Sequence, residues 1–294
     1  LLFVPGLKHA SVFKWLFDRH IVYIPKPGKD KTKPENLRPL SMLEVMYKIQ
    51  TRIMANRLIR AQNNVSSDSQ HGFRPGRSCH TAIFPVLSAI HHADSSGKGL
   101  VLLSVDISSA FDTINPKIIK EVMEKQGYPI IFNEALHDIT TKGQARVRLG
   151  TETGDTFDIR TGSGQGDPPS APRFTTGTEP LTRALATNLT DLRYQVDEVD
   201  IPPVVYADDN MLALSINSVE DMSRVMDIFT DYTKVSGLKI NMTKTEIMGI
   251  NMDDMLMNDI CNIFNFKKVA QMTYLGIELS NSWNNSQEAP TQPT

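Results

Sequence analysis

The sequence predicts an α+β fold in which antiparallel strands pack against helices. Residues 100–105, Leu-Val-Leu-Leu-Ser-Val, form a nearly continuous apolar run, which is typical of a strand buried on both faces. Two short apolar runs, 204–206 and 211–214, flank a polar turn and indicate a hairpin. Segments with apolar residues at helical spacing alternate with these strands. One of them begins at Ser218, a candidate helix cap, and ends at Gly237.

Bulk composition excludes several classes of protein. A chain of 294 residues with 40% apolar content can bury a substantial core. No apolar stretch approaches the roughly 20 residues of a membrane span, so we expect no membrane partner. Cys79 and Cys261 lack neighbours at zinc-finger spacing, so neither a disulfide framework nor structural zinc is predicted. Because the first residue is Leu1, we expect a piece of a longer polypeptide.

Charge is divided unevenly along the chain. Residues 1–80 hold 14 Lys and Arg against 5 Asp and Glu, and the remaining 214 residues hold 17 against 28. The two parts therefore carry net charges of +9 and −11. A basic part can neutralise phosphates and an acidic part can attract divalent cations, although a solvated basic surface is equally compatible with the first count.

In the first third, residues 21–25 predict a strand and 26–34 a basic loop. Ser41, with Glu44 three residues later, predicts a capping box that opens a helix. That helix is expected to pack through one apolar stripe, which consists of Met42, Val45, Met46, Ile49 and Ile53. Ser78 is a candidate cap for the next helix, which Pro85 is expected to kink or shorten.

Further elements follow the strand that stops at Asp106. Residues 116–127 predict a helix with proline near its start and glycine at its end. A hairpin is predicted at 144–160, followed by a glycine-rich loop, and a further strand at 238–241. Residues 274–277 predict one more short strand, and the polar segment after Ser280 predicts disorder.

Three carboxylates are placed where a metal site could form. Asp106 follows the buried strand, and Asp208 and Asp209 lie at the tip of the hairpin. If that strand and hairpin are neighbours in one antiparallel sheet, the carboxylates converge. Phosphoryl transfer needs two divalent cations roughly 4 Å apart, and hard oxygen ligands suit Mg²⁺. The alternative for Asp208 and Asp209 is a solvated surface turn.

Eight sequence blocks extend this interpretation. They are Ile24–Lys29, Asn36–Ser41, Gln70–Arg74, Asp106 with Ala110–Asp112, Gln165–Gly166, Tyr206–Asp209, Gly237–Asn241 with Lys244–Thr245, and Tyr274–Gly276. Their order resembles that of the reverse transcriptase motifs, and the early blocks are similar to the non-LTR, LINE-like retrotransposon branch. The resemblance covers about residues 20–280.

The resemblance implies a right-hand polymerase with palm and fingers. Fingers are expected at 1–98, with extra N-terminal blocks, and the palm at 99–280. The palm would carry a fingers-type insertion near 141–162, a primer-grip-like hairpin near 272–280, and a disordered end at 281–294. A thumb is expected to be largely absent from this chain.

The same resemblance assigns the chemistry. Asp106 and Asp208 would be the principal metal ligands, the Ile107 carbonyl an additional one, and Asp209 a less direct one. Two Mg²⁺ ions are implied, with Mn²⁺ as a substitute. Lys244 would protonate the leaving pyrophosphate or else be an exposed loop lysine. The implied partners are an RNA template, including the element's own RNA, a DNA primer and deoxynucleoside triphosphates.

Nucleotide-binding residues are implied as well. Lys26 and Arg38 resemble the cations that grip the incoming triphosphate, and the alternative for each is a surface cation. Gln165 and Gly166 resemble the loop along the nascent base pair, although an ordinary glycine-rich turn has the same composition. Phe111 resembles the side chain that blocks the 2′-hydroxyl of a ribonucleotide, and the alternative is a core phenylalanine.

Contacts with template and primer are implied at two further places. Arg74 and Arg77 would contact the template backbone, or be plain turn residues, and Tyr274, Leu275 and Gly276 would form the primer grip. Asp167 departs from the family, and beside the nucleotide site its charge would handicap catalysis. The alternative function is therefore a catalytically decayed or maturase-like RNA-binding module with the same fold.

Overall fold

The computed structural model describes residues 18–282, which form two compact units. The first unit consists of residues up to 65 together with 109–178, and the second of 66–108 together with the residues from 179 onward. Residues 1–17 of the predicted fingers and residues 283–294 of the predicted disordered end lie outside the described residues. The fingers and palm boundaries stay predictions. Between residues 18 and 282, no helix is long and apolar enough to cross a membrane.

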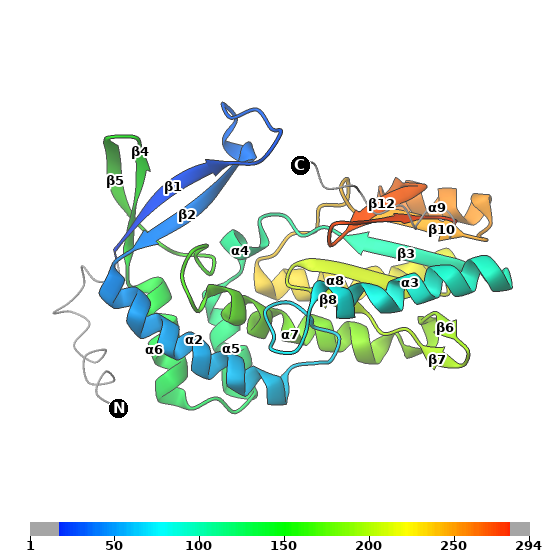
Figure 1. Cartoon of the computed structure of the whole chain (residues 1–294), viewed down its shortest axis with the longest axis horizontal. Helices are drawn as coiled ribbons and strands as arrows, with labels where there is room; N and C mark the ends of the chain where they lie inside the picture. The colour runs from blue at the N-terminus through cyan, green and yellow to red at the C-terminus, as the bar shows by residue number, and fades with distance from the viewer. Residues whose placement is uncertain (1–17, 283–294) are drawn as a thin grey trace. The chain divides into compact units, whose positions relative to one another are not determined.

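The first unit contains a four-stranded sheet in the order β2-β1-β4-β5 (Figure 1). Strands β1 (Arg19–Pro25) and β2 (Leu37–Leu43) form an antiparallel hairpin around the basic loop, which includes the short helix η2 (Pro34–Asn36). Strand β4 (Gln144–Leu149) pairs parallel with β1 and antiparallel with β5 (Glu152–Asp158). The predicted hairpin at 144–160 is therefore confirmed.

Helices make up the rest of this unit. They are α2 (Val45–Val65), α4 (Ala110–Thr113), α5 (Pro116–Lys125), α6 (Ile130–Thr141) and the first part of α7 (Ser170–Asn188). Pro116 occupies the first turn of α5, as the sequence predicts, and Asn115 caps this helix. The periodicity of apolar residues did not predict α6 or α7. In α7, prolines and threonines interrupt the apolar pattern.

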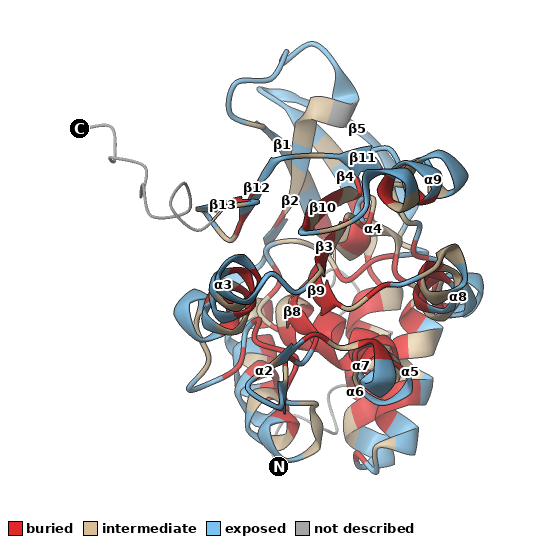
Figure 2. Ribbon diagram, turned by 90° about the vertical axis from the view of Figure 1, so that its right-hand side faces the viewer, coloured by how far each residue is buried: buried red, intermediate tan, exposed pale blue. Residues whose placement is uncertain are grey.

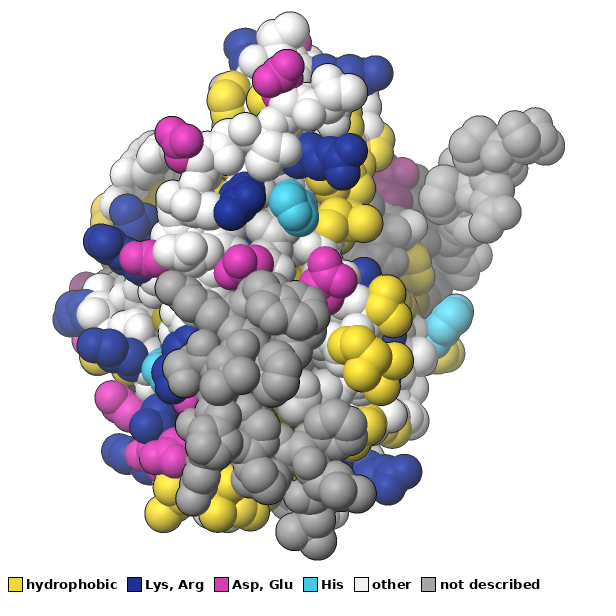
Figure 3. Space-filling view, turned by 90° about the vertical axis from the view of Figure 1, so that its left-hand side faces the viewer, with side chains coloured by type: hydrophobic (Ala, Val, Ile, Leu, Met, Phe, Trp, Pro, Cys, Tyr) yellow, Lys and Arg dark blue, Asp and Glu magenta, His cyan; other side chains and the backbone are white. Residues whose placement is uncertain are grey.

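The prediction for α2 is wrong in two respects. Ser41 lies in β2, where it pairs with Ile21, so it does not cap the helix. The predicted packing stripe is exposed: Met42, Val45, Met46, Ile49 and Ile53. The opposite face is buried, and it includes Tyr47, Thr51 and Gln62, because these polar groups find hydrogen-bond partners inside the unit. Figure 3 shows exposed apolar side chains, in yellow, on the right-hand side of the face that it presents and in a separate group at the bottom.

The second unit is built on a five-stranded sheet in the order β11-β10-β3-β9-β8. Its strands are β3 (Leu100–Val105), β8 (Val204–Tyr206), β9 (Asp209–Leu214), β10 (Glu246–Ile250) and β11 (Lys267–Lys268). Helices α3 (Cys79–Ser96) and α8 (Val219–Ser236) lie on opposite sides of this sheet (Figure 2). The central strand β3 is buried almost throughout, which confirms the prediction from its apolar run.

Smaller elements complete the unit: η3 (Thr190–Leu192), β6 (Gln195–Val196), β7 (Val199–Asp200), α9 (Asp254–Phe264), β12 (Gln271–Tyr274) and β13 (Ile277–Ser280). The caps predicted at Ser78 and Ser218 are confirmed, each as a capping box. Pro85 does not shorten α3, which runs for 18 residues. The single strand predicted at 274–277 is wrong, because Leu275 and Gly276 form the turn of the β12–β13 hairpin, with φ of 50° and 83°.

Candidate functional site

The sheet of the second unit brings the three carboxylates to one end of two neighbouring strands. Val105, the last residue of β3, pairs with Asn210 of β9, so Asp106 and Asp209 lie at the same end of two adjacent strands. Tyr206 pairs with Asp209, which leaves Ala207 and Asp208 as a two-residue turn. The convergence expected from the sequence is therefore the arrangement that the strands adopt.

The backbone around Asp106 is fixed from its other side. The Asn241 amide donates to the Asp106 carbonyl at 2.8 Å, and the Ser108 amide donates to the Lys239 carbonyl at 2.8 Å. Ile107 lies opposite Ile240 between these two bonds, so its own carbonyl takes part in neither of them. The predicted strand at 238–241 is reduced to this single bridge.

Electrostatics distinguishes Asp208 and Asp209 from ordinary surface carboxylates. Burial, and then the neighbouring Asp208 and Asp106, raise the pKa of Asp209 to about 6. Burial, and then Asp106, also raise the pKa of Asp208. Within residues 18–282, no three His, Cys, Asp or Glu side chains are grouped closely enough in this structure to hold a metal ion. The residues nevertheless fit a divalent cation, because oxygen donors that repel one another are stabilised by a positive charge between them.

A magnesium-dependent melting experiment tests this fit. A proton on Asp209, whose folded pKa is about 6 against an ordinary 3.8, competes with a cation, so Mg²⁺ should stabilise the protein little at pH 5 and increasingly as the pH rises past 6. At a cation concentration about ten times the dissociation constant, the gain should approach roughly 1.4 kcal/mol at pH 8. Thermal unfolding with MgCl₂, or with KCl of equal ionic strength, measures it. An equal Mg²⁺ effect at pH 5 and 8 would contradict the assignment.

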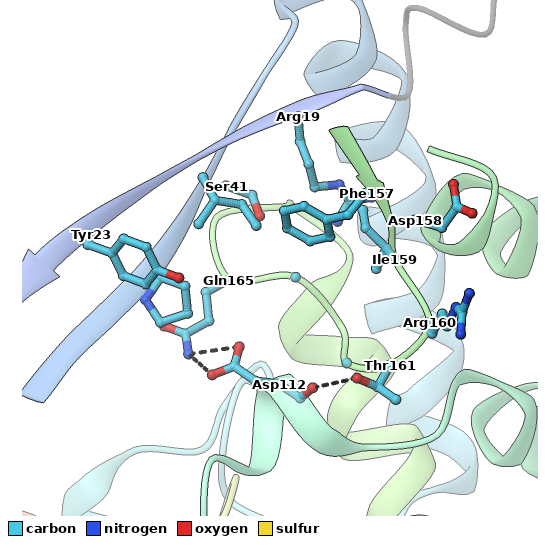
Figure 4. Close-up of a pocket in the computed structure, with 14 residues that line it drawn as sticks. Arg19, Tyr23, Ser41, Asp112, Phe157, Asp158, Ile159, Arg160, Thr161 and Gln165 are labelled. Carbon is cyan, nitrogen blue, oxygen red and sulfur yellow. Dashed lines mark hydrogen bonds between the residues drawn. The ribbon is translucent and has the colours of Figure 1, made fainter. Parts of the chain in front are cut away.

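The first unit holds a cavity of about 410 Å³ beside the glycine-rich loop (Figure 4). The Gln165 amide nitrogen lies 3.3 and 3.4 Å from the two carboxylate oxygens of Asp112, and both side chains line the cavity. Burial raises the pKa of Asp112, while Gln165 and the Lys26 ammonium lower it. Asp112 thus connects two residues that the sequence assigned to nucleotide binding.

The glycine-rich loop is held tightly against β2. The Ser41 amide donates to the Gln165 carbonyl at 2.7 Å. Gly166 has φ of +97°, and a Cβ on it would lie 2.8 Å from the Ser41 carbonyl oxygen. Only glycine fits there without displacement. Gly166 is exposed, and the close approach that requires glycine in this structure is to the strand.

Phe111 and the predicted phosphate-binding cations lie in this unit too. The half-buried Phe111 ring stacks on Phe174 with centroids 4.2 Å apart. Lys26 is half-buried, and its amide donates to the Asn36 carbonyl at 2.8 Å, which closes the basic loop. Arg38 is exposed on β2 opposite Ile24.

The expectation that Asp167 handicaps catalysis is wrong, because its carboxylate is not an exposed charge beside the nucleotide-binding loop. Its side chain is buried and accepts a 2.7 Å hydrogen bond from the Tyr47 hydroxyl. Burial raises the pKa of Asp167, and the Tyr47 hydrogen bond, Arg19 and Arg173 lower it. Both arginines are themselves buried, so the carboxylate balances positive charge inside the unit.

Replacing Asp167 with alanine should therefore destabilise the protein by about 3 kcal/mol, since it leaves buried arginine charge without its counter-charge. Chemical denaturation measures the loss. Asp155→Ala, on the exposed strand β5, is the control and should change stability by less than about 0.5 kcal/mol. Unchanged stability of Asp167→Ala would contradict a buried, charge-balancing role for this carboxylate.

The predicted template and primer residues are divided between interior and surface. Arg74 is buried and donates to the carbonyls of Ser67 and Gln70, which favours the alternative of a structural turn residue. Arg77 is less buried and pairs with Asp68. Tyr274 is buried and its hydroxyl donates to the Val204 carbonyl at 3.3 Å, so only Leu275 and Gly276 reach the surface of that turn.

Two features of the site had only a motif as their sequence signal. Gln70 and Gly72 lie in the Gln70–Arg74 block, where the resemblance implies a role for Arg74 alone, and the structure places them against the turn that carries Asp208. Asp112 also belongs to a quoted block, and its contact with Gln165 depends on a loop 53 residues away. Lys244, which the sequence singled out, is exposed in a turn and its amide donates to the Asn241 carbonyl.

Solved structures with the same architecture show the fold. A telomerase of Candida tropicalis in complex with a TWJ fragment of telomeric RNA matches with a TM-score of 0.64 and 12% identity, over 98% of this chain and 47% of that one. The apo telomerase of Candida tropicalis, truncated from its C-terminal domain, matches with a TM-score of 0.62 over 93% and 56%. At this identity the likeness concerns the fold alone, and the predicted right-hand polymerase fold is confirmed.

The chain belongs to the reverse transcriptase (RNA-dependent DNA polymerase) family, whose model matches residues 24–279. Transposon TX1 uncharacterized 149 kDa protein of Xenopus laevis is 26% identical over 76% of the chain. The Pol polyprotein of the type-2 retrotransposable element R2DM and the probable RNA-directed DNA polymerase from transposon BS, both of Drosophila melanogaster, are 25% and 27% identical over 78% and 76%. The chain spans only 17%, 21% and 25% of these three relatives. The predicted resemblance to non-LTR retrotransposon enzymes is confirmed.

Proposed function

We propose that this chain is a polymerase core that copies RNA into DNA. The observation that carries the proposal is the meeting of Asp106 with the Asp208–Asp209 turn at one edge of the β3–β9 pair, in a chain of the reverse transcriptase family. The family generally uses divalent metals. Two Mg²⁺ ions, for which Mn²⁺ could substitute, would be held by Asp106, Asp208, Asp209 and the Ile107 carbonyl.

When bound, the cations would lower the pKa of the primer 3′-hydroxyl and neutralise the leaving pyrophosphate. The protein's own contribution is to hold its ligands in fixed positions. Asp106 is fixed through its backbone by Asn241, and Asp208 is carried by a tight turn between paired strands. Prior placement of charged groups lowers the barrier because little reorganisation remains during the reaction. Lys244 lies in an exposed turn, where it would be a proton donor to the leaving group.

The remaining residues would bind the substrates. Lys26 and Arg38 would grip the triphosphate of a deoxynucleotide, and the basic hairpin loop favours such an anion. Gln165, held by Asp112, would lie along the new base pair with Gly166, and Phe111 would exclude a 2′-hydroxyl. Arg77 would contact the RNA template, and the turn at Leu275 and Gly276 the DNA primer.

Primer extension tests the proposal. With an RNA template, a DNA primer, deoxynucleotides and Mg²⁺, we expect template-dependent addition that stops when a chelator removes the metal. The assay should be run on this chain and on a version extended toward the length of its relatives, because the chain spans at most a quarter of the three compared above. Nucleic-acid binding with no extension by either version would overturn the proposal in favour of an RNA-binding module.

A further inference from the structure

The loop at Ser69–Gly72 runs alongside the strand that leads into the Asp208 turn. The Val205 amide donates to the Ser69 carbonyl at 2.9 Å, and the His71 amide donates to the Val205 carbonyl at 2.7 Å. Gln70 is therefore bridged in parallel to Val205. Strand β8 has only three residues and is the edge strand of its sheet, so it has a neighbouring strand on one side only. The loop provides backbone hydrogen bonds on the other side.

The side chain of Gln70 reaches the turn itself. It is fully buried, and its Oε1 accepts hydrogen bonds from the Ala207 amide at 3.1 Å and the Gly72 amide at 2.8 Å. Ala207 has φ of 59°, a left-handed conformation that residues with a side chain adopt only when their surroundings hold them there. The bond to Gln70 holds the peptide that joins Tyr206 to Ala207, and the next residue along the turn is Asp208.

Gly72 brings the same loop into direct contact with the turn. A Cβ at this position would lie 2.4 Å from the Ala207 nitrogen and 3.1 Å from its Cα. Those atoms are backbone and cannot rotate aside, so any larger residue must push the loop and the turn apart. Gly72 has no positive φ, which means that space and not backbone conformation requires glycine here.

We propose that Gln70 is a positioning residue for metal binding: it holds Ala207 in its left-handed conformation and so sets the direction of the Asp208 carboxylate relative to Asp106. Gly72 permits the approach that this requires. The inference rests on the proposed function for its consequence in catalysis. The positioning itself is a property of the metal-free protein and can be measured without any reaction.

Amide hydrogen exchange of metal-free protein is the first measurement. In Gln70→Ala, the Ala207 amide loses its acceptor and should exchange at least tenfold faster, while the amides of β3 keep their protection. Gln70→Glu retains an oxygen at the same reach, and the Gln70 Nε2 that it replaces has no hydrogen-bond partner among residues 18–282, so protection should return to within about twofold of wild type. Unchanged exchange at Ala207 in Gln70→Ala overturns the proposal.

The matched control is a second buried glutamine. Gln62 lies in the first unit, where its side chain donates to the Pro172 carbonyl and to Thr176. Gln62→Ala should therefore lower stability without altering exchange at Ala207. If Gln62→Ala accelerates Ala207 as much as Gln70→Ala does, the effect is general loosening and the proposal fails. Gly72→Ala, with Gly154→Ala as the glycine control that has room for a Cβ, repeats the test should Gln70→Ala not fold.

Mn²⁺ binding followed by electron paramagnetic resonance is the second measurement. Gln70→Ala and Gly72→Ala should bind Mn²⁺ at least fivefold more weakly, and Gln70→Glu and Gly154→Ala should show no such loss. In primer extension, Gln70→Ala should lower kcat about tenfold and leave the KM for deoxynucleotides unchanged. A wild type without polymerase activity would refute the proposed function alone, because the exchange and Mn²⁺ results still decide the role of Gln70. Mn²⁺ affinity equal to wild type in Gln70→Ala overturns the proposal.

Discussion

Asp208→Asn should reduce primer extension by at least ~100-fold, because losing one ligand charge weakens both cation binding and neutralisation of charge in the transition state. Asp208 lies on a two-residue turn opposite the end of β3, and burial together with Asp106 raises the pKa of its carboxyl. An amide at this position keeps the shape of the side chain and removes the charge. Rates of single-nucleotide addition at saturating Mg²⁺ measure the effect.

The control for Asp208→Asn is Asp227→Asn, which removes the same charge from the exposed face of α8 and should leave the rate within about twofold. Binding of primer and template should survive in both variants, since phosphate contacts supply most of that affinity. A near-normal rate for Asp208→Asn would show that the metal assignment is wrong.

Phe111→Val should admit ribonucleotides and raise their incorporation relative to deoxynucleotides by more than tenfold. A rigid ring excludes a 2′-hydroxyl by overlap, and the smaller side chain removes that overlap, which corresponds to about 1.4 kcal/mol of discrimination. The ring is half-buried and stacked on Phe174, so it is both held in place and partly open to solvent. Single-nucleotide incorporation with each sugar type on wild type and variant measures the change.

Phe174→Leu separates sugar selection from packing. Phe174 is fully buried, so this variant should lose the stacking and some stability without gaining ribonucleotide use. If Phe111→Val has the selectivity of wild type, Phe111 is a core side chain, and the strongest residue-level reason for expecting a DNA product is lost.

Local rules predicted the helix boundaries that depend on neighbouring residues. The caps at Ser78 and Ser218 and the glycine end at Gly237 depend on contacts within a few residues, so the sequence contains all their partners. Ser41 fits the same motif and fails, because pairing of β2 with β1 satisfies its backbone first. A capping motif shows that a segment can begin a helix, but pairing with a neighbouring strand can prevent it from doing so.

The packing of α2 shows a different limit. The periodicity of its apolar residues identified a helix and the wrong buried face, since the helix has apolar residues on both sides. The face of α2 that is buried in the structure carries Tyr47 and Gln62, whose partners Asp167 and Pro172 lie more than 100 residues away in sequence. Burial of a polar group is favourable only when a partner exists, and the sequence does not show the partner.

By itself, the sequence determined the family, the strand that ends at Asp106, and the hairpin that carries Asp208 and Asp209, because each depends on residues close together in the chain. Only the tertiary structure decided that Asp167 and Arg74 point inward, and that Gln70 holds the turn before Asp208 across 137 residues. The physical reason is that hydrogen bonding and charge compensation in the interior are satisfied between segments distant in sequence, whereas capping and strand periodicity are satisfied within one segment.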